Sequence, residues 1–130
     1  MSKNKYVNDF NEVIIGIVKY ITQFYGDMNT MKLQFVLEET IKKTPEEPIF
    51  LFMCKIYNND EYRKNILAQN DLFFIGKDYN DLVKNDENKV AQIFQFKSLW
   101  NTIDNNTKTL IKKSMVALVN ISREYILNCL

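Results

Sequence analysis

Apolar residues recur at spacings of three and four along nearly the whole chain, and this periodicity constrains the fold more than any other feature. The first such stripe follows residue 9 and consists of Phe10, Val13, Ile14, Ile17, Val18, Ile21 and Phe24. Side chains three and four apart share one face of an α-helix, so the stripe predicts an amphipathic helix that ends near Gly26. Gly16 lies inside the stripe, where it lowers helix propensity and marks a candidate close crossing of helices.

A second helix is predicted from about Thr30 to Lys43, because Lys42 and Lys43 suit the negative end of a helix dipole. Its inward-facing residues are expected to be Leu33, Val36, Leu37 and Ile41. The segment TPEEP, which follows directly, then predicts another helix start.

In TPEEP, Thr44 has the position of an N-cap, Pro45 the first helical position and Glu47 the spacing of a capping box. The ring of Pro48 would press on the cap carbonyl, so a start at Pro48 is the alternative. The apolar stretch IFLFMCKIY, residues 49–57, comes next and is apolar nearly all round. We therefore expect a central buried helix there, with Cys54 as a buried reduced thiol, although a short apolar run also fits a strand.

The segment NND at residues 58–60 predicts a break and a new cap, and the polar residues 76–89 predict the one long loop. Helix is expected again from Val90, and Asp104 is expected to cap a last helix running to about residue 127. Trp100 is interpreted as filling the corner between these two helices. The fold class predicted for residues 1–130 is all-α: one domain, a single compact bundle of about five to seven helices with a long C-terminal helix.

The residue types that carry most enzyme chemistry are missing or badly spaced. The chain has no histidine, its two cysteines lie 75 positions apart, and its three glycines are isolated, so triads, zinc sites and phosphate-binding loops are disfavoured. The acidic residues of the 76–89 loop lack the glycine and the final glutamate of a calcium loop. We therefore predict no catalytic, cofactor-binding or metal-ligating residues and no enzymatic activity.

Charge and hydropathy limit the partners. The 17 cations and 16 anions give a net charge of +1, and only two of the cations are Arg, so nucleic acid is disfavoured as a partner. If it binds, the candidate basic face is Lys108, Lys112 and Lys113. No apolar run reaches the roughly 18–20 residues that span a bilayer, and no secretory signal is recognisable, so we expect an intracellular protein without membrane insertion.

The 17 aromatic residues exceed what a small core needs. The simpler interpretation is that Phe replaces Leu in the core, since 66 of the 130 residues are Phe, Tyr, Met, Ile, Asn or Lys, as an AT-rich genome would encode. The alternative is that some aromatic side chains are exposed anchors for a partner. The candidate interaction surface is Phe73, Phe94, Phe96 and Trp100.

Three segments carry a resemblance to a family: ILAQNDLFF at 66–74, FKSLW at 96–100 and TKTLI at 107–111. Together they resemble a pattern in uncharacterised proteins of giant DNA viruses of amoebae and algae, over roughly the second half of the chain. The matching positions are Asn70, Asp71, Phe74, Phe96, Leu99, Trp100, Thr107, Lys108 and Ile111. The chain departs from the pattern at Lys112, where the pattern tends to carry Trp.

The resemblance implies an all-helical viral accessory or particle-associated protein, located in the host cytoplasm, the viral factory or the virion. We therefore expect a non-enzymatic protein that binds itself or another viral or host protein. Two alternatives stay open: a nucleic-acid-binding protein of the viral factory, and a Bcl-2-like viral regulator of host signalling built around a buried central helix.

Overall fold

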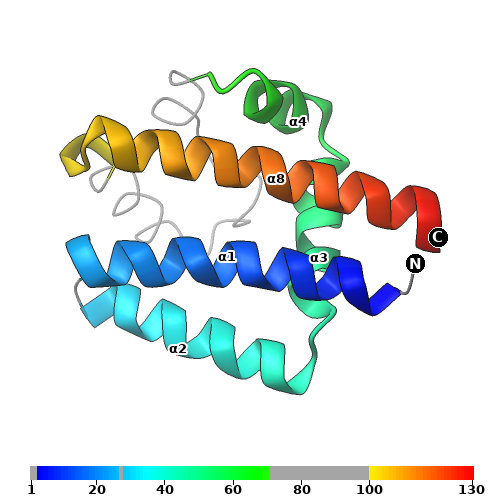
Figure 1. The fold of residues 1–130 in the computed structure, drawn as a ribbon, viewed down its shortest axis with the longest axis horizontal. Helices are drawn as coiled ribbons and strands as arrows, with labels where there is room; N and C mark the ends of the chain where they lie inside the picture. The colour runs from blue at the N-terminus through cyan, green and yellow to red at the C-terminus, as the bar shows by residue number, and fades with distance from the viewer. Residues whose placement is uncertain (1–2, 27, 71–99) are drawn as a thin grey trace, which may run out of the picture.

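The computed structural model describes residues 3–26, 28–70 and 100–130, and these ranges are helical almost throughout (Figure 1). In chain order the elements are α1 (Lys3–Tyr25), α2 (Met28–Lys43), α3 (Glu47–Phe52), the π-helical turn η1 (Met53–Tyr57), α4 (Asp60–Leu67) and α8 (Asn105–Cys129). The described ranges contain no strand. The predicted all-α bundle with a long C-terminal helix is confirmed.

Helix α1 is the central element of the bundle. It lies between α8 on one side and α2 on the other, and the N-terminus of α1 lies at the same end as the C-terminus of α8, so the two run antiparallel (Figure 1). Its residue Phe10 is fully buried, whereas Gly16 is exposed and an added Cβ there would meet no atom within 4 Å. The expected close crossing at Gly16 is therefore wrong.

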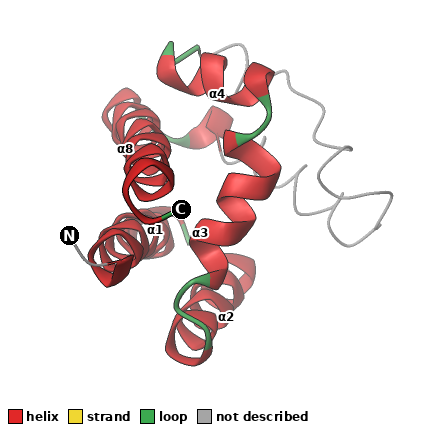
Figure 2. Ribbon diagram, turned by 90° about the vertical axis from the view of Figure 1, so that its right-hand side faces the viewer, coloured by secondary structure: helices red, strands yellow, loops and turns green. Residues whose placement is uncertain are grey.

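Helix α3 and η1 together cross one end of the bundle, from the layer of α2 to that of α4 (Figure 2). They bury Ile49, Phe52 and Met53, and the ring of Phe52 meets that of Phe10 edge-on at 5.4 Å between centroids. Phe50, Leu51 and Cys54 are exposed on the other side.

Residues 49–57 are thus helical, as expected, but the prediction that they form the central buried helix is wrong. A helix that crosses the outside of a bundle buries only one stripe, so an apolar composition all round leaves the apolar side chains of the outer side, here Phe50, Leu51 and Cys54, in solvent. The predicted burial of Cys54 fails for the same reason.

The start of α3 differs from the capping box predicted at Thr44. The helix begins at Glu47, with Pro48 in its first turn, and the residue at the N-cap position makes no side-chain cap. The carbonyl of Thr44 instead accepts a hydrogen bond from the Glu47 N–H at 3.0 Å, which closes a turn. Asn11 of α1 donates to the Pro45 carbonyl at 2.9 Å, and this bond fixes the turn to the central helix.

The predicted break at residues 58–60 is confirmed. Asn59 caps α4, because its side-chain oxygen accepts a hydrogen bond from the Tyr62 N–H at 3.2 Å. The guanidinium of Arg63 donates to the Tyr57 carbonyl at 2.7 Å and lies 5.2 Å from the centre of the Tyr57 ring. Arg63 therefore joins the end of η1 to the first turn of α4, satisfying a carbonyl at the end of a helix.

In the corner ahead of α8, the burial of Trp100 and the cap by Asp104 are confirmed, whereas the predicted loop at 76–89 and the helix expected from Val90 to residue 99 lie outside the described residues. Trp100 is buried, residues 100–102 are helical, and Asp104 is the N-cap of α8, with its carboxylate accepting a hydrogen bond from the Thr107 N–H at 2.7 Å. The 25 residues of α8 make it about 37 Å long at 1.5 Å per residue. It therefore extends along the full length of α1.

Candidate interaction surface

The aromatic residues predicted to form an interaction surface do not form one within the described part of the chain. Phe73, Phe94 and Phe96 lie outside the described residues. Trp100 is only 1% exposed and belongs to the core, so its assignment to an interaction surface is wrong. The indole lies at the start of α8, where the ammonium of Lys108 is 5.9 Å from the ring centre. The Trp100 indole therefore packs inside the corner as a core side chain.

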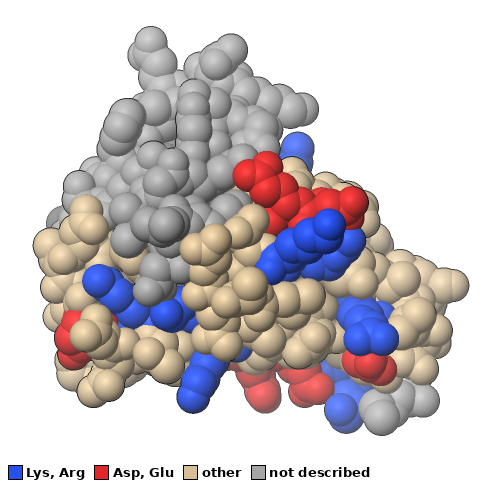
Figure 3. All heavy atoms as spheres, turned by 90° about the horizontal axis from the view of Figure 1, so that it is seen from above, with Lys and Arg blue, Asp and Glu red and all other residues tan. Residues whose placement is uncertain are grey.

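The predicted basic face does not form one open patch. Lys108 and Lys112 are one turn apart on α8 and both are half-buried, and only Lys113 is exposed. The half-burial of Lys108 and Lys112 shows that this side of α8 turns partly towards the core. Seen from above, the described cations occur in separate groups with acidic side chains among them (Figure 3). A phosphate backbone needs a continuous basic track, which this face does not show.

The largest gathering of exposed apolar side chains in the described residues lies on α2. We call it the α2 outer face and define it as Met31, Leu33, Phe35 and Val36. The exposed fractions of these residues range from 56% for Leu33 to 64% for Phe35. Phe24, at the end of α1, is a further exposed aromatic at 58%. Single exposed apolar residues are ordinary, but at 100° per residue Phe35 and Val36 lie near the middle of the exposed side of α2, with Met31 and Leu33 at its two edges, so the four cover that side.

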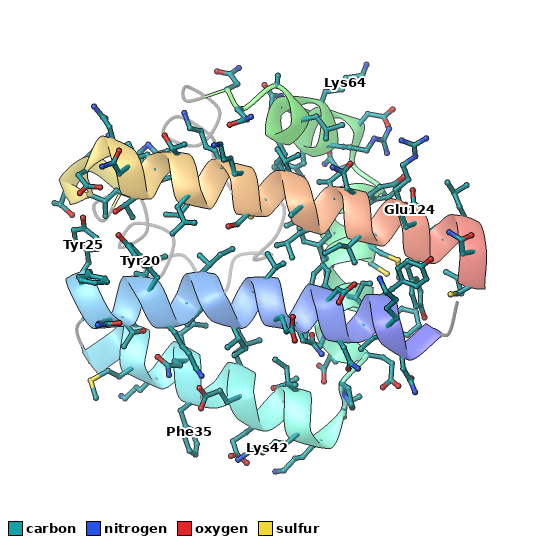
Figure 4. The ribbon with its side chains drawn as sticks, in the orientation of Figure 1. Tyr20, Tyr25, Phe35, Lys42, Lys64 and Glu124 are labelled. Atoms are coloured by element: carbon teal, nitrogen blue, oxygen red, sulfur yellow. The ribbon has the colours of Figure 1, made fainter. Side chains whose placement is uncertain are left out.

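The position of α2 in the bundle explains why this face is open. Helix α2 packs against α1 and, at its end, against α3, and its half-buried residues include Leu37 and Ile41. Phe35 and Lys42 project from the side of α2 that faces away from α1 (Figure 4). Among the described residues no element lies over that side. Leu33 and Val36, which were predicted to face inward, are therefore exposed.

Charges of both signs accompany the apolar residues of the α2 outer face. Lys32 is exposed, and spacings of three, four and seven place it on one side of α2 with Phe35, Val36 and Glu39. The side chain of Glu39 is 37% exposed and its carboxylate lies 3.6 Å from the Lys42 ammonium. An exposed pair of this kind contributes little to stability, so it does not prevent Glu39 from pairing with another cation.

A shallow depression lies beside α2, at the start of α3. It has a volume of about 440 Å³ and is lined by Thr44, Glu46, Glu47, Phe50, Leu51 and Cys54. Ligand sites are usually enclosed and hold a few converging polar groups. This depression is wide open and mostly apolar, so it extends the exposed apolar surface without forming a catalytic cleft.

The described ranges also lack a cluster of metal-ligating side chains and a membrane-spanning helix. Among residues 3–26, 28–70 and 100–130, no group of three or more Cys, Asp or Glu side chains is placed to hold a metal ion. Within the same ranges, no helix combines the length and the apolar character needed to cross a bilayer.

Comparison of the chain with protein-family models, with curated proteins and with solved structures gave no match.

The sequence carries one signal for the α2 outer face besides the stripe of Leu33, Val36, Leu37 and Ile41. Met31 and Phe35 are one turn apart and lie about 120° around the helix from Leu37 and Ile41. A helix whose apolar residues spread this far around its axis cannot bury all of them against one neighbour.

Proposed function

We propose that this protein is a non-enzymatic viral accessory or particle-associated protein that acts by burying the α2 outer face against another protein surface. The observation that carries the proposal is the set of four large apolar side chains, each more than half exposed, on a helix that already packs by its other side. Burying such side chains releases about 25 cal/mol per Å² of apolar area, so a complementary surface would be bound favourably.

The composition of the face suits binding to protein. Phe35 is the most exposed of the four residues and is aromatic, and aromatic side chains dominate the binding energy of many interfaces. Lys32 and Glu39 add charges that would orient a partner. The AT-rich composition and the resemblance to giant-virus proteins support the viral part of the proposal.

The α2 outer face supports the proposal better than the features behind the two alternatives. Nucleic-acid binding relied on Lys108, Lys112 and Lys113, of which two are half-buried. The Bcl-2-like alternative requires a buried central helix at residues 49–57, but the central helix of the bundle is α1.

The test is the size of the protein in extracts of cells that express the tagged full chain. Wild type is expected to migrate above the mass of the tagged monomer, which is 15.4 kDa plus that of the tag, and the double variant Phe35→Asp/Val36→Lys is expected to migrate as a monomer. The matched control is Leu127→Lys, which changes a 66% exposed leucine near the end of α8 and should migrate as wild type. If wild type and the double variant both migrate as monomers in the extract, and purified wild type also stays monomeric up to about 500 μM, the proposal is wrong.

A further inference from the structure

We infer that the α2 outer face binds a second copy of this chain, with the two α2 helices antiparallel about a twofold axis between Phe35 and Val36. The inference rests on the proposed function and names its partner. Homo-oligomers with twofold symmetry are the most common assemblies, and they require a surface that is complementary to itself. The residues of α2 meet that requirement.

The antiparallel register brings opposite charges together. The axis passes between Phe35 and Val36. A residue that lies a given number of positions before the axis in one copy therefore faces the residue that lies the same number of positions after it in the second copy. Phe35 then lies opposite Val36 of the second copy, and Lys32 lies opposite Glu39 of the second copy. Symmetry repeats both contacts, so the interface has an apolar centre with an ion pair on each side.

The charges also exclude the parallel arrangement. In a parallel pair in register, Lys32 would lie beside Lys32 and Glu39 beside Glu39. Like charges that face each other across an interface are unfavourable, so the pattern selects the antiparallel orientation. Met31 and Leu33 lie at the two edges of the exposed side of α2, about 90–110° around the helix from the line of Lys32 and Glu39, and so border the central contact.

The size of α2 sets the strength of the association. Its 16 residues are about 24 Å long, and one face of such a helix buries less than the roughly 800 Å² per partner of a standard interface. We therefore expect a reversible dimer with a dissociation constant of about 10–100 μM, rather than an obligate one.

The test is sedimentation of the purified full-length protein at concentrations from about 1 μM to 500 μM, which bracket the expected dissociation constant. Wild type is expected to pass from monomer to dimer over this range. Lys32→Glu and Glu39→Lys should each raise the dissociation constant of the dimer by at least about tenfold. In each variant, like charges lie opposite each other at both positions where wild type has an ion pair.

The decisive sample is an equimolar mixture of the two single variants. A mixed dimer contains one copy of each variant. In one ion pair, the carboxylate introduced at position 32 faces the ammonium introduced at position 39. In the other, the original Lys32 faces the original Glu39. The mixture should therefore dimerise about as strongly as wild type. Because the mixture contains the same two proteins, recovery also shows that neither variant had failed to fold. Lys64→Glu on α4, well away from α2 in Figure 4, is the matched control and should behave as wild type.

Two results would overturn the inference: a purified wild type that stays monomeric throughout, or single variants that dimerise as wild type does. Neither result alone contradicts the proposed function. A purified monomer whose extract still contains a larger species dependent on Phe35 and Val36 would mean that the same face binds a different protein. Monomers in both the purified sample and the extract would contradict the proposed function as well.

Discussion

The hydroxyl of Tyr25 lies 3.3 Å from Oγ1 of Thr107, which joins the last turn of α1 to the first turn of α8 across 82 positions of sequence. The same hydroxyl accepts a hydrogen bond from the Asp104 N–H at 3.4 Å. Asp104 in turn caps α8 through the Thr107 N–H. Three side chains therefore hold the start of α8 against the end of α1.

Tyr25→Phe removes the hydroxyl and keeps the ring, so it tests this junction directly. The contacts of the hydroxyl with Thr107 Oγ1 and with the Asp104 N–H are long, and we expect the free energy of unfolding to fall by about 0.5–1 kcal/mol. Denaturant unfolding would measure the change. In a double-mutant cycle with Thr107→Val the two losses should be less than additive, because each change breaks the same contact. Strict additivity would show that the two hydroxyls do not interact.

Asp104 makes stability depend on pH in a defined direction. The hydrogen bond from the Thr107 side chain, followed by that from the Thr107 N–H, lowers the pKa of Asp104 below its usual 3.8, and Tyr25 adds to the effect while partial desolvation opposes it. A lowered folded-state pKa contributes stability that is complete above the unfolded-state pKa and is lost as pH falls through the folded-state pKa.

Asp104→Asn isolates this contribution, because Asn is also a good N-cap but does not titrate. The stability of wild type relative to the variant should be constant above about pH 5 and should decrease below about pH 4. Unfolding free energies of both proteins over this range would measure it. A difference that is the same at every pH would contradict the assigned pKa shift.

Two glycines give opposite predictions from their surroundings. Gly16 lies within α1 with open space around it, so Gly16→Ala should raise the free energy of unfolding by about 0.5–1 kcal/mol through helix propensity. At Gly26 an added Cβ would lie 2.1 Å from the carbonyl oxygen of Thr22, so Gly26→Ala should lower it by more than about 1 kcal/mol. Thermal unfolding of the two variants compares them. Destabilisation by Gly16→Ala would mean that this position is packed.

The parts of the fold that the sequence predicted are those with local causes. Asp104 and Asn59 cap helices because each side chain reaches a backbone N–H three positions on, which depends only on neighbouring residues. Thr44 has the same kind of side chain, but Pro48 lies four positions later and α3 starts at Glu47. A cap signal therefore holds only when the residues of the following turn permit it.

The parts that the sequence did not predict depend on which elements become neighbours. Periodicity shows that Leu33 and Val36 share one side of α2, but it cannot show that α1 packs against a different side. The same limit explains Cys54, whose apolar surroundings in sequence did not make it buried in the fold. The candidate site was missed for this reason: an exposed apolar face differs from a core face only in what covers it.

The contrast between a core and a surface phenylalanine tests this assignment of faces. Phe10 is fully buried against Phe52, so Phe10→Ala should lower the free energy of unfolding by about 3–5 kcal/mol. Phe35 is 64% exposed, so Phe35→Ala should change the free energy of unfolding of the monomer by less than about 0.5 kcal/mol. Denaturant unfolding at low protein concentration, where a weak dimer is dissociated, would compare the two variants. A large loss from Phe35→Ala would show that α2 packs by the face described as open, and the interaction surface would then have to lie elsewhere.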